Sequence, residues 1–244
     1  MRFLARCLPS FVYRTGIISA LVVLALVTAP AHAQDVIYHL DFSDYDEGSV
    51  EHWLGAKGFT FKGDADDRRK MELDVSDDGL VLEAIRPARA MLLNERVNLD
   101  RFDRVRINWR VDRYPNGANY DQGKRSEPVM LIVFFGHERV KSGSMLIPDS
   151  PYFIGLFPCK EGTPQKAYTG RYFQKSGRYV CVDQPKEGEL TTVEFPLAKA
   201  YREIFQIESV PLISGISLST DSANAKDGKS RAVIASIEFL VEDL

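Results

Sequence analysis

The sequence lacks several features that would identify a class of protein at once. No long apolar run follows residue 33, neither sign of charge dominates (31 Lys and Arg against 34 Asp and Glu), and Cys occurs only 3 times in 244 residues. Nucleic acids and anionic membranes select for a basic surface, so the formal net charge of −3 argues against both partners. The 45% hydrophobic content is nevertheless ample for a globular chain.

Motifs of the common enzyme classes are missing as well. The sequence contains no Gly-x-Ser-x-Gly elbow, phosphate-binding loop, dinucleotide fingerprint or zinc-protease helix motif. The later histidines, His39, His52 and His137, stand in no metal-ligand spacing with another His or Cys. We therefore expect no cofactor and no transition-metal site.

The first 33 residues have the pattern of a secretory signal peptide. Arg2, Arg6 and Arg14 precede an apolar stretch at 16–29, and residues 31–33 supply the Ala-His-Ala pattern that signal peptidase reads. The alternative is an uncleaved anchor, but the apolar run is shorter than the ~20 residues that span a bilayer, and no lipobox Cys follows it. We predict cleavage after residue 33 and a periplasmic or secreted protein, residues 34–244, with a net charge of −6 and no membrane insertion.

Two cysteines remain after this cleavage, Cys159 and Cys181. Outside the cytosol they permit a single disulfide, which would contribute about 3 kcal/mol by restricting the unfolded chain. The alternative is two separate buried thiols. Their spacing excludes a Cys-x-x-Cys redox or zinc motif.

The pattern of the remaining chain is that of strands. Linkers, repeats and low-complexity tracts are absent, so we expect one domain over residues 34–244. Short β-prone runs separated by Asp, Gly and Pro lie at 36–42, 71–75, 80–85, 91–93, 105–111, 129–135, 152–157, 178–182, 191–195, 213–219 and 233–241. This predicts an all-β fold, a two-sheet antiparallel β-sandwich or jelly roll.

Three segments make sharper predictions. Residues 105–111 alternate apolar and polar, as in a strand with one solvated face. Residues 129–135 are apolar throughout, which indicates a central strand covered on both faces. One helix is expected at 197–205, because it follows Pro196 and has an apolar stripe of Leu197, Ala200, Tyr201 and Ile204.

A succession of short motifs carries a family resemblance. They are Trp-Arg-Val at 109–111, the loop Asp-Gln-Gly-Lys-Arg-Ser-Glu at 121–127, Phe-Phe-Gly at 134–136, Lys-Ser-Gly at 175–177, Phe-Pro-Leu at 195–197 before 201–205, and the segments 216–224 and 235–239. Over residues 53–240 the chain resembles the exported bacterial domain-of-unknown-function family 3047. The resemblance implies a β-sandwich like those of carbohydrate-binding modules, and it implies no activity. The family's Thr-Asp-x-Asp-Asn run here lacks its second acid (residues 220–224).

The loop at 113–127 is the first candidate binding surface. It combines Tyr114 and Tyr120 with Asp121, Arg125 and several amides. Flat aromatic faces suit pyranose rings, and planar polar groups suit their hydroxyls, so this mixture is typical of sugar sites. The alternative is an ordinary solvated loop whose Tyr rings lie on the sheet edge.

Two further segments are candidate sites, and each has an alternative structural interpretation. The segment 221–228, with Asp221 and Asn224, offers oxygen ligands for a cation such as Ca²⁺, although the same residues also form ordinary turns. His137 could act as an acid or base at the end of the apolar strand, or be a partly exposed strand-end side chain.

Three functions follow from these features. The favoured hypothesis is an exported non-catalytic protein that binds a glycan through the 113–127 loop. The second is a polysaccharide lyase or hydrolase using His137, Arg125 and Tyr172 or Tyr179, because residues 172–179 resemble motifs of jelly-roll alginate lyases, whose Gln-Ile-His motif is missing here. The third is a structural partner in an envelope assembly that uses a flat sheet face.

Overall fold

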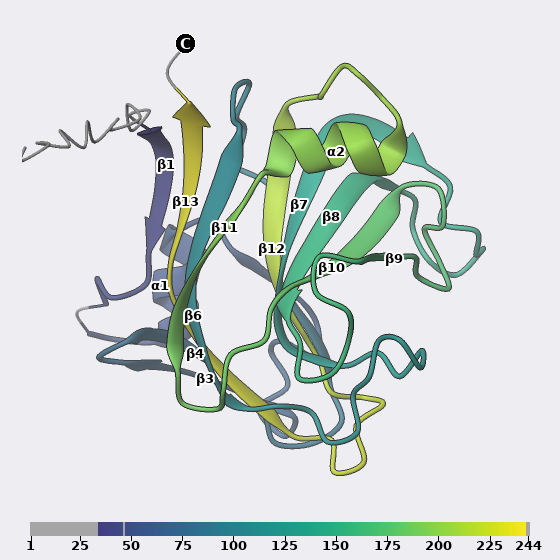
Figure 1. Ribbon diagram of the computed structural model, residues 1–244. Helices are drawn as coiled ribbons and strands as arrows, with labels where there is room; N and C mark the ends of the chain where they lie inside the picture. Colours follow the sequence, from purple (N-terminus) through teal and green to yellow (C-terminus); the bar gives the residue numbers. More distant parts are fainter. Residues whose placement is uncertain (1–33, 46, 243–244) are drawn as a thin grey trace, which may run out of the picture. The chain divides into compact units, whose positions relative to one another are not determined.

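The protein is an all-β sandwich. The computed structural model describes residues 34–45 and 47–242, so the predicted signal peptide lies outside the described residues. Two sheets pack face to face, and two short helices accompany them (Figure 1). The predicted fold class is therefore confirmed. No helix in the described part of the chain is long and apolar enough to cross a membrane.

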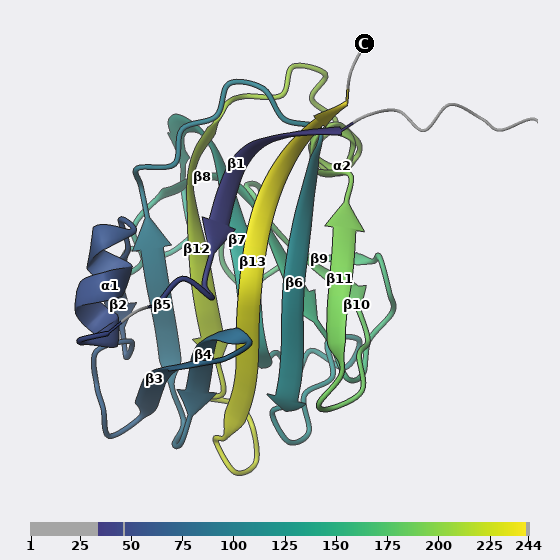
Figure 2. The same cartoon turned by 90° about the vertical axis from the view of Figure 1, so that its left-hand side faces the viewer.

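The six-stranded sheet forms one layer. Its order is β11-β6-β13-β4-β3, and β1 pairs with the end of β13 that extends beyond β4 (Figure 2). The strands are β1 (Gln34–Asp41), β3 (Met71–Ser76), β4 (Gly79–Ala84), β6 (Arg104–Arg113), β11 (Leu190–Phe195) and β13 (Ser230–Glu242). Strand β6 alternates as predicted, since Trp109 and its apolar neighbours face the core while Arg106 pairs with Glu194 and Glu238 on the outer face.

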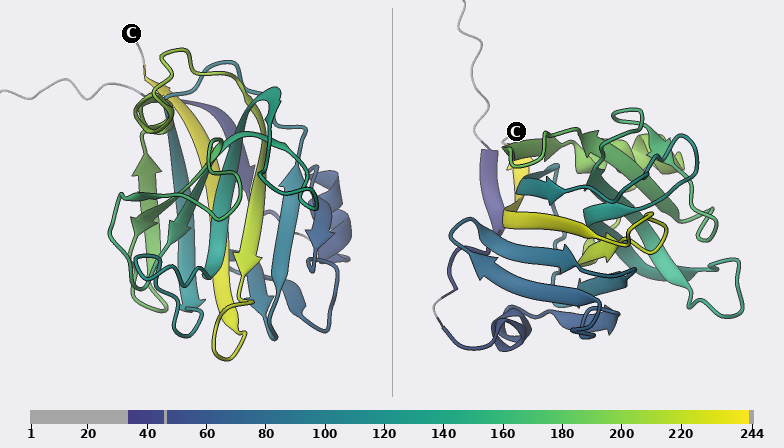
Figure 3. Two further views of the ribbon diagram at one scale, coloured as in Figure 1. Left: turned by 90° about the vertical axis from the view of Figure 1, so that its right-hand side faces the viewer. Right: turned by 90° about the horizontal axis from the view of Figure 1, so that it is seen from below.

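The seven-stranded sheet forms the other layer, in the order β2-β5-β12-β7-β8-β10-β9 (Figure 3). Its strands are β2 (Thr60–Gly63), β5 (Arg89–Asn94), β7 (Glu127–Val140), β8 (Ser150–Pro158), β9 (Ala167–Tyr168), β10 (Gly177–Asp183) and β12 (Ile213–Asp221). The apolar run at 129–135 lies in β7, at the centre of this sheet, and almost all of it is buried, which confirms the prediction.

Of the two helices, the sequence pattern predicted one and not the other. Helix α2 (Leu197–Phe205) lies across one end of the sandwich, where Tyr201 packs on Phe135 with ring centroids 4.7 Å apart. Helix α1 (Val50–Ala56) was not predicted. Its start is set by Ser49, whose side chain accepts a hydrogen bond from the backbone N–H of His52, but seven residues are too few to display a helical period.

One strand pair departs from the antiparallel expectation. Strands β8 and β10 run parallel, whereas the other pairs among the described strands are antiparallel. A parallel pair needs a crossover connection, which residues 159–176 provide. Cys159 and Cys181 form the predicted disulfide, with Cα atoms 5.6 Å apart, and it joins the start of this crossover to β10.

The crossover covers part of the outer face of the seven-stranded sheet. Its Tyr168 and Phe173 belong to a second hydrophobic cluster, separate from the core between the sheets. The strands contribute Met130, Ile132 and Phe153 to this cluster. The crossover therefore packs onto β7, β8 and β10 and does not extend over β12 and β5 (Figure 3). The border of the crossover forms an edge that runs across the outer face of the sheet.

Candidate functional site

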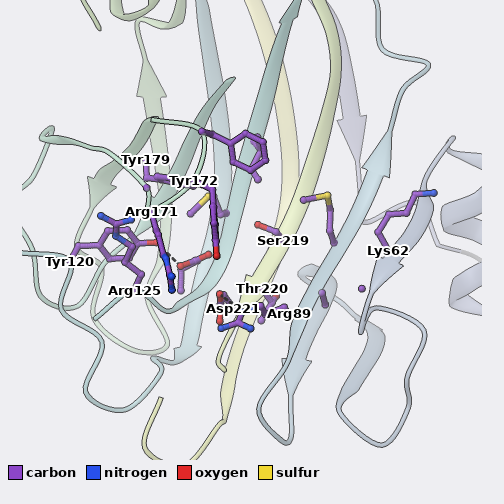
Figure 4. Close-up of a pocket in the computed structure, with 18 residues that line it drawn as sticks. Lys62, Arg89, Tyr120, Arg125, Arg171, Tyr172, Tyr179, Ser219, Thr220 and Asp221 are labelled. Atoms are coloured by element: carbon purple, nitrogen blue, oxygen red, sulfur yellow. Dashed lines mark hydrogen bonds and ion pairs between the residues drawn. The ribbon is translucent and has the colours of Figure 1, made fainter. Parts of the chain in front are cut away.

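A groove of about 380 Å³ opens at that edge (Figure 4). This volume lies within the ~300–1,000 Å³ typical of small-molecule sites. Strands β2, β5, β12 and β7 form its floor, and the crossover and the loop before β7 form its wall. The lining side chains include Lys62, Arg89, Met91, Tyr120, Arg125, Glu127, Met130, Ile132, Arg171, Tyr172, Phe173, Tyr179, Ser219 and Asp221.

A β-bulge places two carboxyl groups on the floor. Ser219 pairs with Met130, but Asp221 pairs with Glu127, so β7 contains one residue more than β12 over this stretch. The extra residue changes the alternation of β7 and aims Glu127 at the same face as Asp221. Pro128 suits this position because it has no N–H to pair, and its carbonyl accepts a hydrogen bond from Thr220 Oγ1.

Glu127 is a strongly perturbed carboxyl group of the groove. Its side chain is buried, and the Tyr120 hydroxyl donates a hydrogen bond to its Oε2 over 2.5 Å. Burial, reinforced by the nearby Asp221, raises the pKa of Glu127 to about 8. Burial also raises the pKa of Asp221, which receives a hydrogen bond from Arg89 Nε over 3.3 Å. At neutral pH Glu127 is therefore mainly protonated, and it lies beside the Asp221 carboxyl group that pairs with Arg89.

Arg125 is held at the rim by backbone contacts. Its guanidinium donates to the carbonyl of Thr169, and its own carbonyl accepts from Asn224 Nδ2 over 3.1 Å. Its Nε is buried and has no hydrogen-bond partner among the described residues. Buried polar groups are normally paired, so this N–H is an unsatisfied donor on a side chain that lines the groove.

Consecutive crossover residues form one part of the wall. Phe173 adopts a left-handed backbone conformation (φ 55°), and its N–H donates to the carbonyl of Ser142. This conformation is uncommon for a bulky residue, and it turns the chain next to Tyr172 and Arg171. The Arg171 guanidinium lies 5.4 Å from the centre of the Tyr172 ring, within cation–π distance. Tyr179 also lines the groove, and burial raises its pKa to about 12.

A glycine keeps room beside the floor. Gly155 lies on β8 next to Met130, and a Cβ at this position would come within 2.4 Å of the Met130 sulfur and 3.3 Å of the Tyr179 ring. Both side chains line the groove. A larger residue at 155 would therefore displace the groove lining.

Only some of the candidate residues meet in this groove. Tyr120, Arg125 and Asp221 line it, and Asn224 supports Arg125 from outside. The first half of the 113–127 loop does not contribute to it. Tyr114 lies at a separate cavity of about 530 Å³, where its buried hydroxyl donates to the carbonyl of Pro185.

Asp121 and His137 also lie outside the groove. Asp121 is exposed and pairs with Lys166 at 2.6 Å, which fastens the loop to the crossover. His137 is exposed on β7 and lines a small cavity of about 160 Å³. The structure therefore brings Arg125, Tyr172 and Tyr179 together but does not bring His137 to them.

The segment 221–228 adopts turns stabilised by its own side chains. Asp221 Oδ1 accepts from the N–H of Ala223, and Asp227 Oδ1 accepts from the N–H of Lys229. No group of three or more His, Cys, Asp or Glu side chains in the described ranges is arranged to hold a metal ion.

Several groove residues were not singled out from the sequence, namely Lys62, Arg89, Met91, Glu127 and Ser219. Strands β5 and β12 are distant in the chain, so only the sheet order brings Arg89 to Asp221. The one local signal was Pro128 next to Glu127 at the start of an apolar strand, a combination typical of a bulge.

Another cavity of about 590 Å³ lies between α1 and β3. It is lined by Glu51, Arg68 and Glu72 among others, and the Glu51 and Arg68 side chains already pair with each other. The groove differs because it combines an aromatic wall, a buried carboxyl group and a buried N–H that no described residue accepts. We therefore take the groove as the candidate site.

Comparisons with known proteins give distant fold similarities. No family model and no curated protein matches the sequence, so the resemblance to family 3047 stays a prediction. The potassium-bound carbohydrate recognition domain of Emp46p matches with a TM-score of 0.40 and 10% identity, over 84% of this chain and 96% of that one.

Two other solved structures are similar at comparably low scores. The VIP36 exoplasmic/lumenal domain, in a Ca²⁺/Man3GlcNAc-bound form, has a TM-score of 0.35 at 12% identity and covers 78% of this chain and 86% of its own. A carbohydrate-binding module specific for non-crystalline cellulose, CBM28, has a TM-score of 0.30 at 13% identity, with coverages of 75% and 87%. All three are carbohydrate-binding domains, but these scores are too low to assign a ligand or a site to this chain.

Proposed function

We propose that the protein is an exported, non-catalytic β-sandwich that binds a glycan in the groove on its seven-stranded sheet. The observation that carries this proposal is the composition of the groove. A partly exposed aromatic ring, Tyr172, stands over a floor with the hydroxyl of Ser219 and the carboxylate of Asp221. Aromatic faces pack on the C–H faces of sugar rings, and hydroxyls and carboxylates bind their hydroxyl groups.

Export is the second part of the proposal. It is supported by the signal-like first 33 residues and by the disulfide, because such bridges persist in oxidising compartments. Sequencing the N-terminus of the protein recovered from the periplasm or medium tests it. The expected first residue is Gln34, and a protein retained in the cytosol with residue 1 in place would contradict it.

The glycan proposal is tested by a glycan array followed by calorimetry. Replacing Tyr172 by Ala or Asp221 by Asn should abolish or strongly weaken binding. Asp121→Asn is the matched control, since Asp121 is an equally polar residue of the predicted loop but lies outside the groove. Binding that is lost in the control and retained in the groove variants would place the ligand on the 113–127 loop instead.

One observation favours the enzymatic alternative, a polysaccharide lyase or hydrolase. Groups with strongly shifted pKa values in clefts are often catalytic. Glu127 is such a group, and it accepts a hydrogen bond from Tyr120 and lies near Arg125. Incubating the bound glycan with the protein and analysing its length tests this. Shortening that disappears in Glu127→Gln would establish the enzyme and refute a purely binding role.

A further inference from the structure

The groove has an excess of positive charge. Its lining contains four cations, Lys62, Arg89, Arg125 and Arg171, and two carboxyl groups, Asp221 and Glu127. This composition contrasts with the net charge of −3 of the whole sequence. A locally basic surface on an acidic protein indicates a specific anionic ligand, because general charge would repel such a ligand.

The carboxyl groups do not cancel this excess. Asp221 forms an ion pair with Arg89 and so neutralises one cation. Glu127 is buried beside Asp221, and the pKa of Glu127, raised to about 8, keeps it mainly protonated at neutral pH. Three cations therefore remain uncompensated within the groove.

These three cations are not paired with acidic side chains in the part of the chain that the structure describes. Lys62, Arg125 and Arg171 form no ion pair with any described residue. In contrast, the arginines at the centre of the other sheet, Arg106 and Arg110, are each paired with two carboxylates. Exposed cations elsewhere, such as Arg101 and Lys175, also form no ion pair with a described residue, so what distinguishes the groove is that three such cations line one cavity.

Arg125 is the best positioned of the three. Its contacts with Thr169 and Asn224 fix the side chain and its backbone, while its buried Nε keeps an N–H with no partner among the described residues. A guanidinium that is already ordered loses little entropy on binding, and it forms its strongest hydrogen bonds with carboxylate or sulfate oxygens.

From this arrangement we infer that the groove selects acidic glycans, with the sugar ring packed on Tyr172 and its carboxylate or sulfate group bound by Arg125 and Arg171. Lys62, on the far side of the floor, would face a neighbouring unit of the chain (Figure 4). This inference rests on the proposed glycan-binding function and names its ligand class.

The experiment is calorimetry of the full mature protein with matched pairs of oligosaccharides. One pair is an oligogalacturonate and its methyl ester, which share a backbone and differ in charge. A second pair is a sulfated dextran oligomer and the neutral dextran, and an array of neutral, uronate and sulfated glycans covers other backbones. Acidic members should bind and their neutral counterparts should not, and added salt should weaken binding. If the uronate binds more tightly than its methyl ester, the recognised group is the carboxylate. If the sulfated dextran binds more tightly than neutral dextran, it is the sulfate.

Variants of the groove cations test whether the acidic glycan binds in the groove. Arg125→Gln should weaken binding about tenfold to a hundredfold, the usual range for a charge-assisted hydrogen bond. Arg171→Gln and Lys62→Gln change exposed side chains, so they test the same point if Arg125→Gln fails to fold. Arg101→Gln, an exposed arginine outside the groove, is the matched control and should bind as the original protein does.

The outcomes separate the two proposals. Equal binding of charged and neutral partners, without salt dependence, would overturn the acidic selectivity and leave glycan binding intact. Acidic binding that is unchanged in all three groove variants would also overturn it. Failure of every glycan on the array to bind would overturn the proposed function itself.

Discussion

Glu127 makes the stability of this protein depend on pH in a way that one substitution can isolate. Its pKa is about 8 in the folded protein, against an ordinary value of 4.5. Between these values the folded state binds a proton that the unfolded state has released, so stability falls as pH rises through this window. Each pH unit costs about 1.4 kcal/mol, and the cost at pH 7 is therefore up to about 3 kcal/mol.

Replacing Glu127 by Gln removes this cost. The amide is neutral at every pH, has the same shape and can still accept the hydrogen bond from Tyr120. At pH 7 the variant should be more stable than the original protein by up to about 3 kcal/mol, and the difference should vanish as the pH falls to about 4.5.

Urea denaturation at several pH values measures the difference directly, because other titrating groups contribute equally to both proteins. Glu138→Gln is the matched control, since Glu138 lies on the same strand but is exposed. It should leave the pH dependence unchanged. If Glu127→Gln and the original protein lose stability in parallel between pH 5 and pH 8, the reasoning about the buried carboxyl is refuted.

Further predictions concern the disulfide and the groove. Replacing both Cys159 and Cys181 by Ser should lower the free energy of unfolding by about 3 kcal/mol in urea titrations, and an unchanged midpoint would contradict this. Gly155→Val should cost about 1–3 kcal/mol and weaken glycan binding, because a Cβ there would lie 2.4 Å from a sulfur of the floor. Tyr120→Phe removes a hydrogen bond that lowers the pKa of Glu127, so NMR titration should show a higher pKa, and a lower one would refute the assignment. Affinity for an acidic glycan should fall as pH rises through about 8, where Glu127 ionises among Tyr120, Tyr179, Arg125 and Asp221, and a flat profile would contradict this.

Much of the fold could be predicted because its signals are local. The alternation of 105–111, the unbroken apolar run at 129–135 and the stripe at 197–205 each report a buried face within one element. The elements that were missed, α1, β2 and β9, are seven, four and two residues long. Such short segments contain too little pattern to be distinguished from loops.

The candidate site was only partly predictable because its geometry is not local. The loop composition drew attention to Tyr120 and Arg125, which line the groove, but it could not separate them from Tyr114 and Asp121, which do not. Those positions depend on how the loop crosses the sheet edge. Glu127 depends on the register between two strands about 90 residues apart, which no window of sequence contains.

The bulge at Pro128 has a consequence for tracing this site through evolution. In a regular ladder the residue opposite Asp221 would lie two places before Met130, but Glu127 lies three places before it, and the bulge absorbs the difference. Deleting Pro128 would let the ladder continue regularly with the glutamate still opposite Asp221. A homologous chain could thus carry the acid two or three residues before this methionine position and keep the site. The pairing of the acid with the end of β12 is therefore a better marker of shared function than its distance from the apolar strand.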